Sequence, residues 1–534
     1  MKEYTFTVWA DQPVFETEHF WEAVGNDNMF PQILGESGDF LFERNRTYRT
    51  VRMIRNHHVL SELWENGKQI GGNVYSEDEE GNPVYDFRYI NQIYAKCLEN
   101  GIKPVVEMDY MPKALARPRK TPLFPSGEWY ERASFPDDWD KWRTLLVKFT
   151  ENLVETFGLE EVRTWYFEAW NEPDLCALVP MIQQWPAQEW DQFMRLYDVF
   201  VDAVTSVDSQ LKVGGPGGCT PAFMMQFFQH VCTGTNYVTG TVGTRVDFIS
   251  YHFYGMIGFD MESFPLESTS VAGFIHELHA IHAMMQQFPQ LKNVEFHLNE
   301  WGECAQGGLN KTQYPVFDIL RNSEYSALYL VKLLGSLFRL KERTDFLPSL
   351  LLYWGFTGED AQKQTFLGTR GLTTWPRICK PLLTVMEMLT MLGTQVLKTS
   401  SPAGGRVGAF AMKAPDENGL QVAAWNFDET RIGERYEEAS IALRAEGLAA
   451  GAYRLRVYVL GREKNNTYAV YKSMEQEKTL TEKQLKQIAA ANDWSMEAAY
   501  DVEVDGAFTW TDTIGDNEAR FYILTRREDR EPQD

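Results

Sequence analysis

Apolar runs of strand length alternate with amphipathic stretches of helical length over about the first 395 residues of this 534-residue chain. The amphipathic stretches, such as residues 140–158, have the length and pattern of helices that cover a sheet. Near-continuous apolar strands are typical of a parallel sheet buried on both faces. We expect eight strands, at residues 21–25, 50–55, 103–108, 165–170, 211–215, 246–252, 294–300 and 350–355. Eight strands, each followed by a helix, predict a (β/α)8 TIM barrel, an α/β fold, over residues 16–395.

The pattern changes after the last of these strands. Strand-like stretches recur at residues 420–427, 452–460 and 519–525, and one polar helix is expected over residues 481–493. We therefore expect residues 396–534 to form an accessory C-terminal β-sandwich, completed by a strand from residues 1–15. A chain of this length exceeds one ordinary hydrophobic core, which fits two domains.

The net charge of the chain narrows its possible partners, and the cysteine pattern narrows the possible disulfides and metal sites. The formal net charge is -24, from 51 Lys and Arg against 75 Asp and Glu. Such a surface repels polyanions, so we expect neither nucleic acid nor a membrane as a partner. The six cysteines are scattered without a CxxC pair, which favours reduced thiols over a disulfide framework or a zinc site. The N-terminus lacks the apolar segment of a signal peptide, and we expect a cytoplasmic location.

Two expected strands lead into the same dipeptide, Asn171-Glu172 after WYFEAW and Asn299-Glu300 after VEFHL. A carboxylate at the end of a buried strand loses hydration energy and needs a functional or structural reason. A single Asn-Glu pair is more often a turn or a helix cap. Two pairs, on the fourth and seventh strands of one barrel, predict two carboxylates at the same mouth. Cleavage of a glycosidic bond requires such a pair.

Other strand ends supply the surroundings of this pair. Catalytic groups of such barrels come from the C-terminal ends of the strands and the loops after them. Pro173 biases Glu172 toward an extended conformation, so we expect Glu172 to end its strand and point into the mouth. Arg55 could supply a positive charge that keeps Glu300 ionised. Further polar and aromatic residues at these ends are His57, Glu107, Asp109, His252, Tyr254 and Trp354.

The histidines and Trp354 allow more than one interpretation. His57 and His58 are adjacent on a strand and point to opposite faces, so they cannot both bind one metal ion. We expect no metal and no cofactor, with His57 facing a sugar hydroxyl and His58 in a structural role. His252 is either a site residue or a satisfied core histidine. Trp354, at a strand end, is a candidate platform for stacking a sugar ring.

The chain resembles glycoside hydrolase family 39, the family of β-xylosidases and α-L-iduronidases. The similar stretches run nearly end to end: IRNHHVLSE (54–62), residues 89–116 with their Met-Pro-Lys, WYFEAWNEPDL (165–175), LKVGGPGG (211–218), DFISYHFYG (247–255), EFHLNEWG (295–302), YWGF (353–356) and REKNNTYAVYKSM (462–474).

The resemblance implies a retaining glycosidase with Glu172 as general acid/base and Glu300 as nucleophile. It also implies that Asn171 holds the 2-hydroxyl of the sugar. The remaining residues that it places at the sugar subsite are His57, His252, Tyr254, Trp354 and Glu359, the last of them in the loop after the eighth strand. The substrate would be an oligosaccharide or another glycoside, and the resemblance also allows a homo-oligomer.

Two departures from the family pattern leave the identity of the substrate sugar undetermined. Asn299-Glu300-Trp301 stands where the family commonly has Thr-Glu followed by Phe or Tyr, and His58 stands where it has Gly. The leading hypothesis is an exo-acting β-D-xylosidase, and the alternatives are a β-galactosidase, a β-glucosidase or an α-L-arabinosidase. An iduronidase would need a cation for the sugar carboxylate, and the sequence offers no clear candidate. A non-catalytic carbohydrate-binding protein would be expected to have lost one glutamate.

Overall fold

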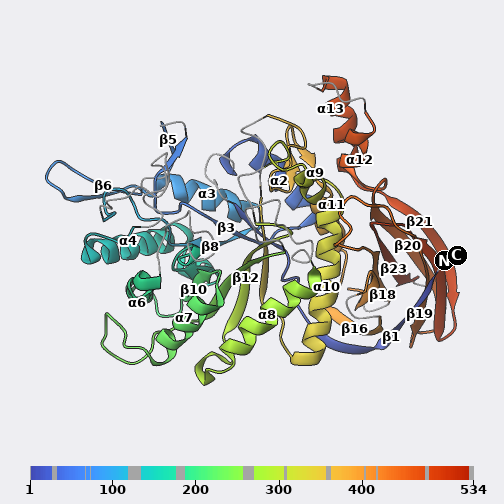
Figure 1. The fold of residues 1–534 in the computed structure, drawn as a ribbon, viewed down its shortest axis with the longest axis horizontal. Helices are drawn as coiled ribbons and strands as arrows, with labels where there is room; N and C mark the ends of the chain where they lie inside the picture. The colour runs from blue at the N-terminus through green and yellow to red at the C-terminus, as the bar shows by residue number, and fades with distance from the viewer. Residues whose placement is uncertain are drawn as a thin grey trace, which may run out of the picture.

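The structure, a computed structural model, describes residues 2–26, 33–65, 68–71, 74–117, 134–175, 187–255, 270–305, 310–356, 363–401, 405–415, 419–474 and 480–527. A closed barrel of eight parallel strands lies beside a nine-stranded, mostly antiparallel sheet (Figure 1). The barrel strands, in spatial order, are β2 (Ala23–Asn26), β3 (Met53–Asn56), β8 (Lys103–Glu107), β9 (Tyr166–Glu168), β10 (Lys212–Gly218), β11 (Phe248–Tyr254), β12 (Glu295–Gly302) and β13 (Leu350–Trp354). The predicted fold class is confirmed.

Amphipathic helices cover the outside of the barrel. The longer ones are α2 (Glu36–Tyr48), α3 (Arg88–Glu99), α4 (Trp139–Phe157), α6 (Trp190–Val207), α7 (Pro221–Thr233), α8 (Val271–Met285), α10 (Tyr325–Thr344) and α11 (Pro381–Leu389). Asp138 caps α4 by accepting hydrogen bonds from the backbone N–H groups of Asp140 and Lys141. The helix buries one apolar stripe that includes Trp142 and Phe149 against the barrel.

Short elements join the barrel strands and helices. They are α5 (Leu159–Val162), α9 (Val316–Asn322), the single-turn helices η3 (Ala187–Glu189) and η5 (Pro289–Leu291), and the paired strands β4 (Leu63–Glu65) with β5 (Lys68–Gly71), β6 (Tyr75–Glu77) with β7 (Pro83–Tyr85), and β14 (Thr373–Thr374) with β15 (Ile378–Cys379).

The second sheet is built from the N-terminal strand and the C-terminal segment of the chain. Its strands, in spatial order, are β21 (Met496–Val504), β20 (Gly451–Gly461), β23 (Glu518–Arg526), β18 (Gly419–Asn426), β17 (Val407–Lys413), β16 (Gln395–Ser400), β1 (Glu3–Glu16), β19 (Ala439–Glu446) and β22 (Ala507–Ile514). Between β20 and β21 the chain forms α12 (Thr467–Lys472), α13 (Glu482–Ala489) and η7 (Ala490–Asn492). The domain boundary at residue 395 stays a prediction.

Helix α10 lies between the barrel and this sheet, and it is buried on nearly all sides. A Cβ atom at Gly335 would lie 2.6 Å from the Trp425 ring of β18, so only glycine allows this close approach. Lys332, the charge that interrupts the apolar run, is buried and pairs with Glu429 at 2.5 Å. In the part of the chain that the structure describes, no helix combines the length and apolar character that a membrane crossing requires.

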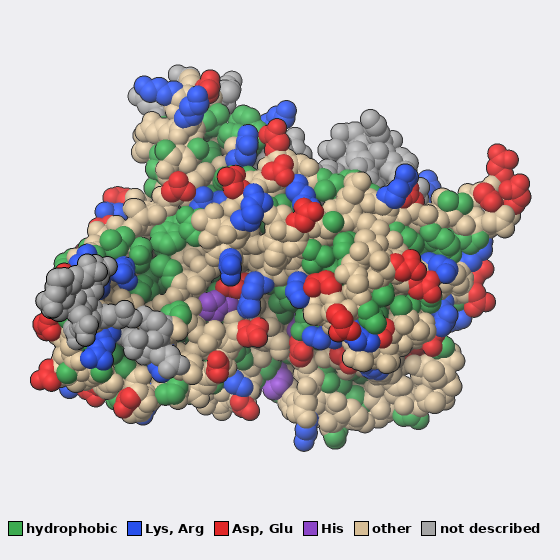
Figure 2. All heavy atoms as spheres, turned by 180° about the vertical axis from the view of Figure 1, so that it is seen from behind, with side chains coloured by type: hydrophobic (Ala, Val, Ile, Leu, Met, Phe, Trp, Pro, Cys, Tyr) green, Lys and Arg blue, Asp and Glu red, His purple; other side chains and the backbone are tan. Residues whose placement is uncertain are grey.

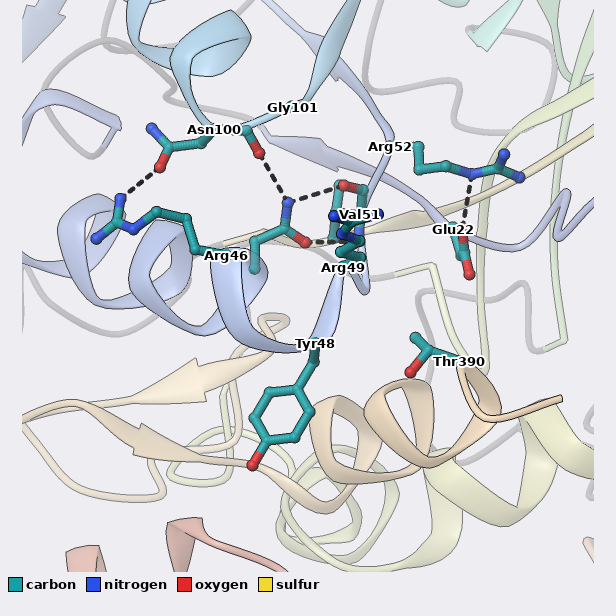
Figure 3. A pocket seen from close by; sticks show the side chains of 10 residues that line it. Glu22, Arg46, Tyr48, Arg49, Val51, Arg52, Asn100, Gly101 and Thr390 are labelled. Atoms are coloured by element: carbon teal, nitrogen blue, oxygen red, sulfur yellow. Dashed lines mark hydrogen bonds and ion pairs between the residues drawn. The ribbon is translucent and has the colours of Figure 1, made fainter. Parts of the chain in front are cut away.

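Neither the surface charges nor the cleft at the barrel base marks the predicted site. Figure 2 shows acidic and basic side chains interspersed over one face of the molecule. A cleft of about 620 Å³ opens where β2, β3 and β8 begin, and its lining includes Glu22, Arg52 and Gly101 (Figure 3). Among the residues that the structure describes, no site residue predicted from the sequence lines this cleft, because those residues lie at the opposite ends of the strands.

Candidate active site

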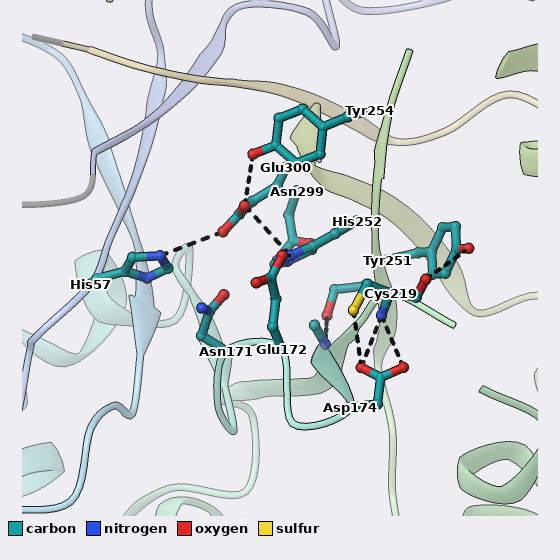
Figure 4. A network of polar contacts seen from close by, with 12 residues as sticks. His57, Asn171, Glu172, Asp174, Cys219, Tyr251, His252, Tyr254, Asn299 and Glu300 are labelled. Atoms are coloured by element: carbon teal, nitrogen blue, oxygen red, sulfur yellow. Dashed lines mark hydrogen bonds and ion pairs between the residues drawn. The ribbon is translucent and has the colours of Figure 1, made fainter. Parts of the chain in front are cut away.

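Glu172 and Glu300 lie together at the C-terminal ends of the barrel strands (Figure 4). Glu300 belongs to β12, and Glu172 lies in the loop after β9. His252 of β11 stands between them, with its Nδ1 atom 3.0 Å from Oε1 of Glu172 and 3.5 Å from Oε2 of Glu300. One side-chain oxygen of each glutamate lies within 4.8 Å of the other. The structure therefore brings the two predicted carboxylates to one point.

The backbone at Glu172 differs from the extended conformation expected before Pro173. Strand β9 ends at Glu168, and Glu172 has a φ of 45°, in the left-handed region. The expectation that Glu172 ends its strand is wrong. Its N–H donates to the carbonyl of Gly217 at 2.9 Å, and Asp174 accepts from the N–H groups of Cys219 and Thr220. These bonds to the next strand hold a conformation that costs on the order of 1–3 kcal/mol in isolation.

Glu300 lies deeper than Glu172 and is held by more donors. Its side chain is 4% exposed, against 15% for Glu172. Nη1 of Arg55 and the Tyr254 hydroxyl each donate to its carboxylate at 2.9 Å. Burial raises the pKa of Glu300, and the charge of Glu172 raises it further. His252, Arg55 and Arg370 act in the opposite direction and lower this pKa. Glu300 is thus easier to ionise when Glu172 carries a proton.

Arg55 is a fully buried guanidinium surrounded by carboxylates. Its Nε donates to Glu168 at 2.6 Å and its Nη2 to Glu107 at 2.6 Å, while Nη1 holds Glu300. Burial acts to lower the pKa of Arg55, but these three carboxylates outweigh it and hold the pKa well above its usual range. The planar fork fixes each partner in a defined direction. Arg55 therefore orients Glu300 as well as supplying the charge predicted from the sequence.

Asn171 and His57 flank the pair of glutamates. Oδ1 of Asn171 accepts from Arg55 at 3.1 Å, and its amide nitrogen donates to the Tyr110 hydroxyl at 2.7 Å. Nδ1 of His57 lies 2.9 Å from Glu107, which leaves Nε2 3.6 Å from Oε1 of Glu300. Both residues thus stand at the site with their side chains oriented by buried partners.

Burial sets the charge state of His252, the residue between the two glutamates. It lowers the pKa of His252 to about 4, against the opposing influence of Glu300. The imidazole is therefore neutral near pH 7 and contributes a hydrogen bond rather than a charge. The structure places His252 beside both glutamates of the predicted site. Its burial also fits the other interpretation given above, a histidine of the core.

Trp354 is buried beside His57 and Arg55, and a glycine on the neighbouring strand makes room for its ring. Its ring lies 4.4 Å from the His57 ring and under the Arg55 guanidinium, 5.2 Å from it. A Cβ atom at Gly25 of β2 would lie 1.9 Å from the indole. Only glycine at this position leaves room for the predicted stacking platform.

Replacing Gly25 by Ala should displace the Trp354 ring. We expect the free energy of unfolding to fall by about 1–3 kcal/mol, as in other overpacked cores. If Trp354 stacks on the sugar, KM rises more than kcat falls, and Trp354→Ala gives the same kinetic change. Steady-state kinetics and thermal unfolding measure both effects. An unchanged KM in both variants would contradict the stacking role.

Asn299 and His58, the two residues that depart from the family pattern, contact neighbouring side chains of the protein. Asn299 donates its amide to Glu168 at 2.6 Å, and Nδ1 of His58 lies 2.9 Å from the Ser61 hydroxyl. These two departures from the family pattern thus contact the buried residues Glu168 and Ser61. Glu359 lies outside the described residues.

Sequence reasoning missed two residues that the structure brings to the site. Glu168 is fully buried and accepts from Arg55, Asn299 and, at 2.5 Å, Ser250. Its signal was available, because it is a carboxylate inside the apolar strand that precedes Asn171. Arg370 donates to the Tyr254 hydroxyl at 2.6 Å from the loop after β13. No motif in the sequence marks it.

Two groups of side chains at the site have a spacing that could hold a metal ion. They are His57, Glu107 and Asp109, and Glu172, His252 and Glu300. Arg55 contacts a carboxylate of each group and supplies positive charge there.

The chain is similar to proteins named β-xylosidase and α-L-iduronidase. The β-xylosidase of Geobacillus stearothermophilus is 27% identical over 436 residues, which cover 79% of this chain and 76% of that protein. The mouse α-L-iduronidase is 24% identical over 56% of this chain and 43% of that protein. The crystal structure of a monomeric β-xylosidase from Caulobacter crescentus superposes with a TM-score of 0.77 at 23% identity, over 98% of this chain and all of that one.

One protein family matches almost the entire chain. Residues 8–509 match the family described as Glycosyl hydrolases family 39. The matched range includes the complete barrel, both glutamates and most of the second sheet. The protein therefore belongs to glycosyl hydrolases family 39.

Proposed function

We propose that this protein is a retaining exo-glycosidase in which Glu172 is the general acid/base and Glu300 the nucleophile. The observation that carries the proposal is the short distance between the two carboxylates, with oxygens within 4.8 Å. Retaining enzymes have carboxyl groups about 5–5.5 Å apart, whereas inverting enzymes leave room for a water molecule at about 6.5–9.5 Å. The distance favours the retaining arrangement.

The environments of the two glutamates support different roles. Glu300 receives donors from Arg55 and Tyr254, which favour the ionised form that attacks C1 of the sugar. Glu172 is more exposed and contacts the neutral His252. In the first step Glu172 protonates the glycosidic oxygen while Glu300 forms a covalent bond to C1 and the leaving alcohol departs. In the second step Glu172 takes a proton from water, which attacks C1 and releases Glu300.

The first candidate substrate is a β-D-xyloside at the non-reducing end of an oligosaccharide or other glycoside. Its support is the similarity to proteins named β-xylosidase, together with the place of the Trp354 ring beside His57. A β-galactoside, a β-glucoside or an α-L-arabinoside on the same scaffold stays an alternative, since the two glutamates act at C1 and at the glycosidic oxygen, which all these glycosides share.

A uronic acid glycoside is a second candidate, and one observation favours it. The sequence offered no clear cation for a sugar carboxylate, but the Arg370 guanidinium lies 2.6 Å from the Tyr254 hydroxyl, which contacts Glu300. A guanidinium so close to the nucleophile could pair with a carboxylate at C5 of the sugar. Relatives named α-L-iduronidase add support to this candidate.

A panel of 4-nitrophenyl glycosides tests the proposal and separates the candidates. It should contain the β-D-xyloside, β-D-glucoside, β-D-galactoside, α-L-arabinoside and β-D-glucuronide, with 4-methylumbelliferyl α-L-iduronide beside them. We expect turnover of one of these glycosides, and proton NMR should show a first-formed product with the anomeric configuration of the substrate. A product of inverted configuration would refute the double displacement.

A further inference from the structure

We propose that Arg370 is a positioning residue that acts on the nucleophile through Tyr254. This inference rests on the proposed role of Glu300 as nucleophile. Arg370 donates from Nη1 to the Tyr254 hydroxyl oxygen at 2.6 Å. That hydroxyl donates to Oε2 of Glu300 at 2.9 Å. The three side chains form one directed chain of hydrogen bonds.

The chemistry of a phenol explains why the guanidinium matters. A tyrosine hydroxyl has one proton and can rotate to give it to any nearby acceptor. Because Arg370 can only donate, its N–H occupies a lone pair of the Tyr254 oxygen and the hydroxyl proton points to Glu300. The positive charge also polarises the O–H bond, which strengthens the second hydrogen bond. Tyr254 becomes a fixed donor to one nucleophile oxygen.

The opposite oxygen of Glu300 is held by Arg55. With Oε1 bound to Arg55 and Oε2 bound to Tyr254, the plane of the carboxylate is fixed from both sides. Arg370 also acts to lower the pKa of Glu300, against the rise caused by burial. Its loss should therefore loosen the nucleophile and make it harder to ionise.

The loop that carries Arg370 is held by both parts of the protein. The carbonyl of Thr369 accepts from the buried Lys380 at 2.8 Å, and the N–H of Lys311 donates to the carbonyl of Leu367 at 3.0 Å. Phe366 packs against the rings of Tyr468 and Tyr471 from α12. These two tyrosines belong to the REKNNTYAVYKSM stretch that resembles the family, so this stretch supports the loop of Arg370.

Arg370→Gln, Tyr254→Phe and the double variant test the relay. The substrate is the neutral aryl glycoside that the unmodified enzyme turns over fastest. Each single variant should lose on the order of 10- to 100-fold in kcat/KM, the usual size for a hydrogen bond to a charged group. The acidic limb of the pH profile should move to higher pH, because removal of a positive charge raises the pKa of Glu300. The double variant should be no worse than Tyr254→Phe.

Arg377→Gln is the matched control, since it makes the same change at a half-exposed arginine in the turn between β14 and β15. It should leave both kcat/KM and the pH profile unchanged. Losses in the double variant equal to the product of the single losses would show that Arg370 acts independently of Tyr254. Normal turnover of the neutral glycoside by Arg370→Gln would also overturn the proposal and leave Arg370 as a sugar-carboxylate ligand only.

A measurement that needs no turnover separates this inference from the proposed function. Carbon-13 NMR of glutamate-labelled protein reports the pKa of the Glu300 carboxyl, which is assigned by its loss in Glu300→Gln. The pKa should rise in Arg370→Gln and in Tyr254→Phe, but not in Arg377→Gln. An unchanged pKa refutes the relay even if the enzyme is active, whereas a shifted pKa in a protein without glycosidase activity refutes only the proposed function.

Discussion

Replacement of Glu300 by Gln should remove turnover of every glycoside while the fold stays intact. The amide keeps the shape of the side chain but cannot form the covalent bond to C1. Loss of a nucleophile costs on the order of 10² to 10⁶ in rate. Folding should survive because Arg55 keeps its hydrogen bonds to the carboxyl groups of Glu107 and Glu168, so the buried guanidinium is not left unpaired. Steady-state kinetics with circular dichroism and thermal unfolding measure both parts.

Glu295→Gln provides the matched control for this prediction. Glu295 lies at the other end of β12 and contacts Tyr166 and His297, away from the two glutamates. The same chemical change on the same strand should leave kcat/KM nearly unaltered. Substantial residual turnover by a folded Glu300→Gln enzyme, beyond the level of wild-type contamination, would contradict the nucleophile assignment.

Replacement of Glu172 by Ala should slow the enzyme by an amount that depends on the leaving group. A glycoside of an alkyl alcohol needs a proton on the departing oxygen, whereas 4-nitrophenolate leaves without one. We therefore expect a loss on the order of 10² to 10⁴ for poor leaving groups, the usual contribution of general acid catalysis, and a much smaller loss in the first step for 4-nitrophenyl glycosides. A series of aryl glycosides with graded leaving-group pKa measures the difference as a steeper dependence of kcat/KM.

External azide gives an independent check on Glu172. In the alanine variant the covalent intermediate lacks its general base, and a small anion can occupy the vacated volume and attack C1 directly. Turnover of the 4-nitrophenyl glycoside should increase with azide, and a glycosyl azide with the configuration of the substrate should accumulate. Asp174→Asn tests the support of the loop, since Asp174 anchors it to Cys219 and Thr220. Equal losses for all leaving groups in Glu172→Ala would rule out the acid role.

The sequence was most informative where a local pattern repeats. The eight apolar strands are predicted in order because burial on both faces requires continuous apolar side chains, whatever the loops contain. The helix expected over residues 140–158 appears as α4 (Trp139–Phe157), since its cap at Asp138 and its apolar stripe are both local signals. In the second sheet, β1, β18, β20 and β23 are anticipated, while β16, β17, β19, β21 and β22 are not. The edge strands β21 and β22 carry many exposed residues, which weakens their apolar pattern.

The backbone of Glu172 shows why local rules fail near the site. The rule for residues before proline predicted an extended strand end. A left-handed turn is selected instead, because the Glu172 N–H donates to Gly217 and Asp174 accepts from Cys219. Those partners lie more than forty residues away in the sequence. The position of the carboxylate is therefore a tertiary property, although its identity as a candidate was already visible in the Asn-Glu pair.

By itself, the sequence determined the barrel, the family resemblance and the two glutamates, because periodicity and a short motif at a strand end are written in neighbouring residues. Only the tertiary structure decided how those glutamates are oriented. Glu300 is held, directly or through a neighbouring side chain, by residues from three different strand ends or loops: Arg55, Glu168 and Arg370. Each hydrogen bond in this set loses its strength when the donor–acceptor distance exceeds the ideal value by about one ångström. Such convergence depends on the closure of the whole barrel, which no window of the sequence contains.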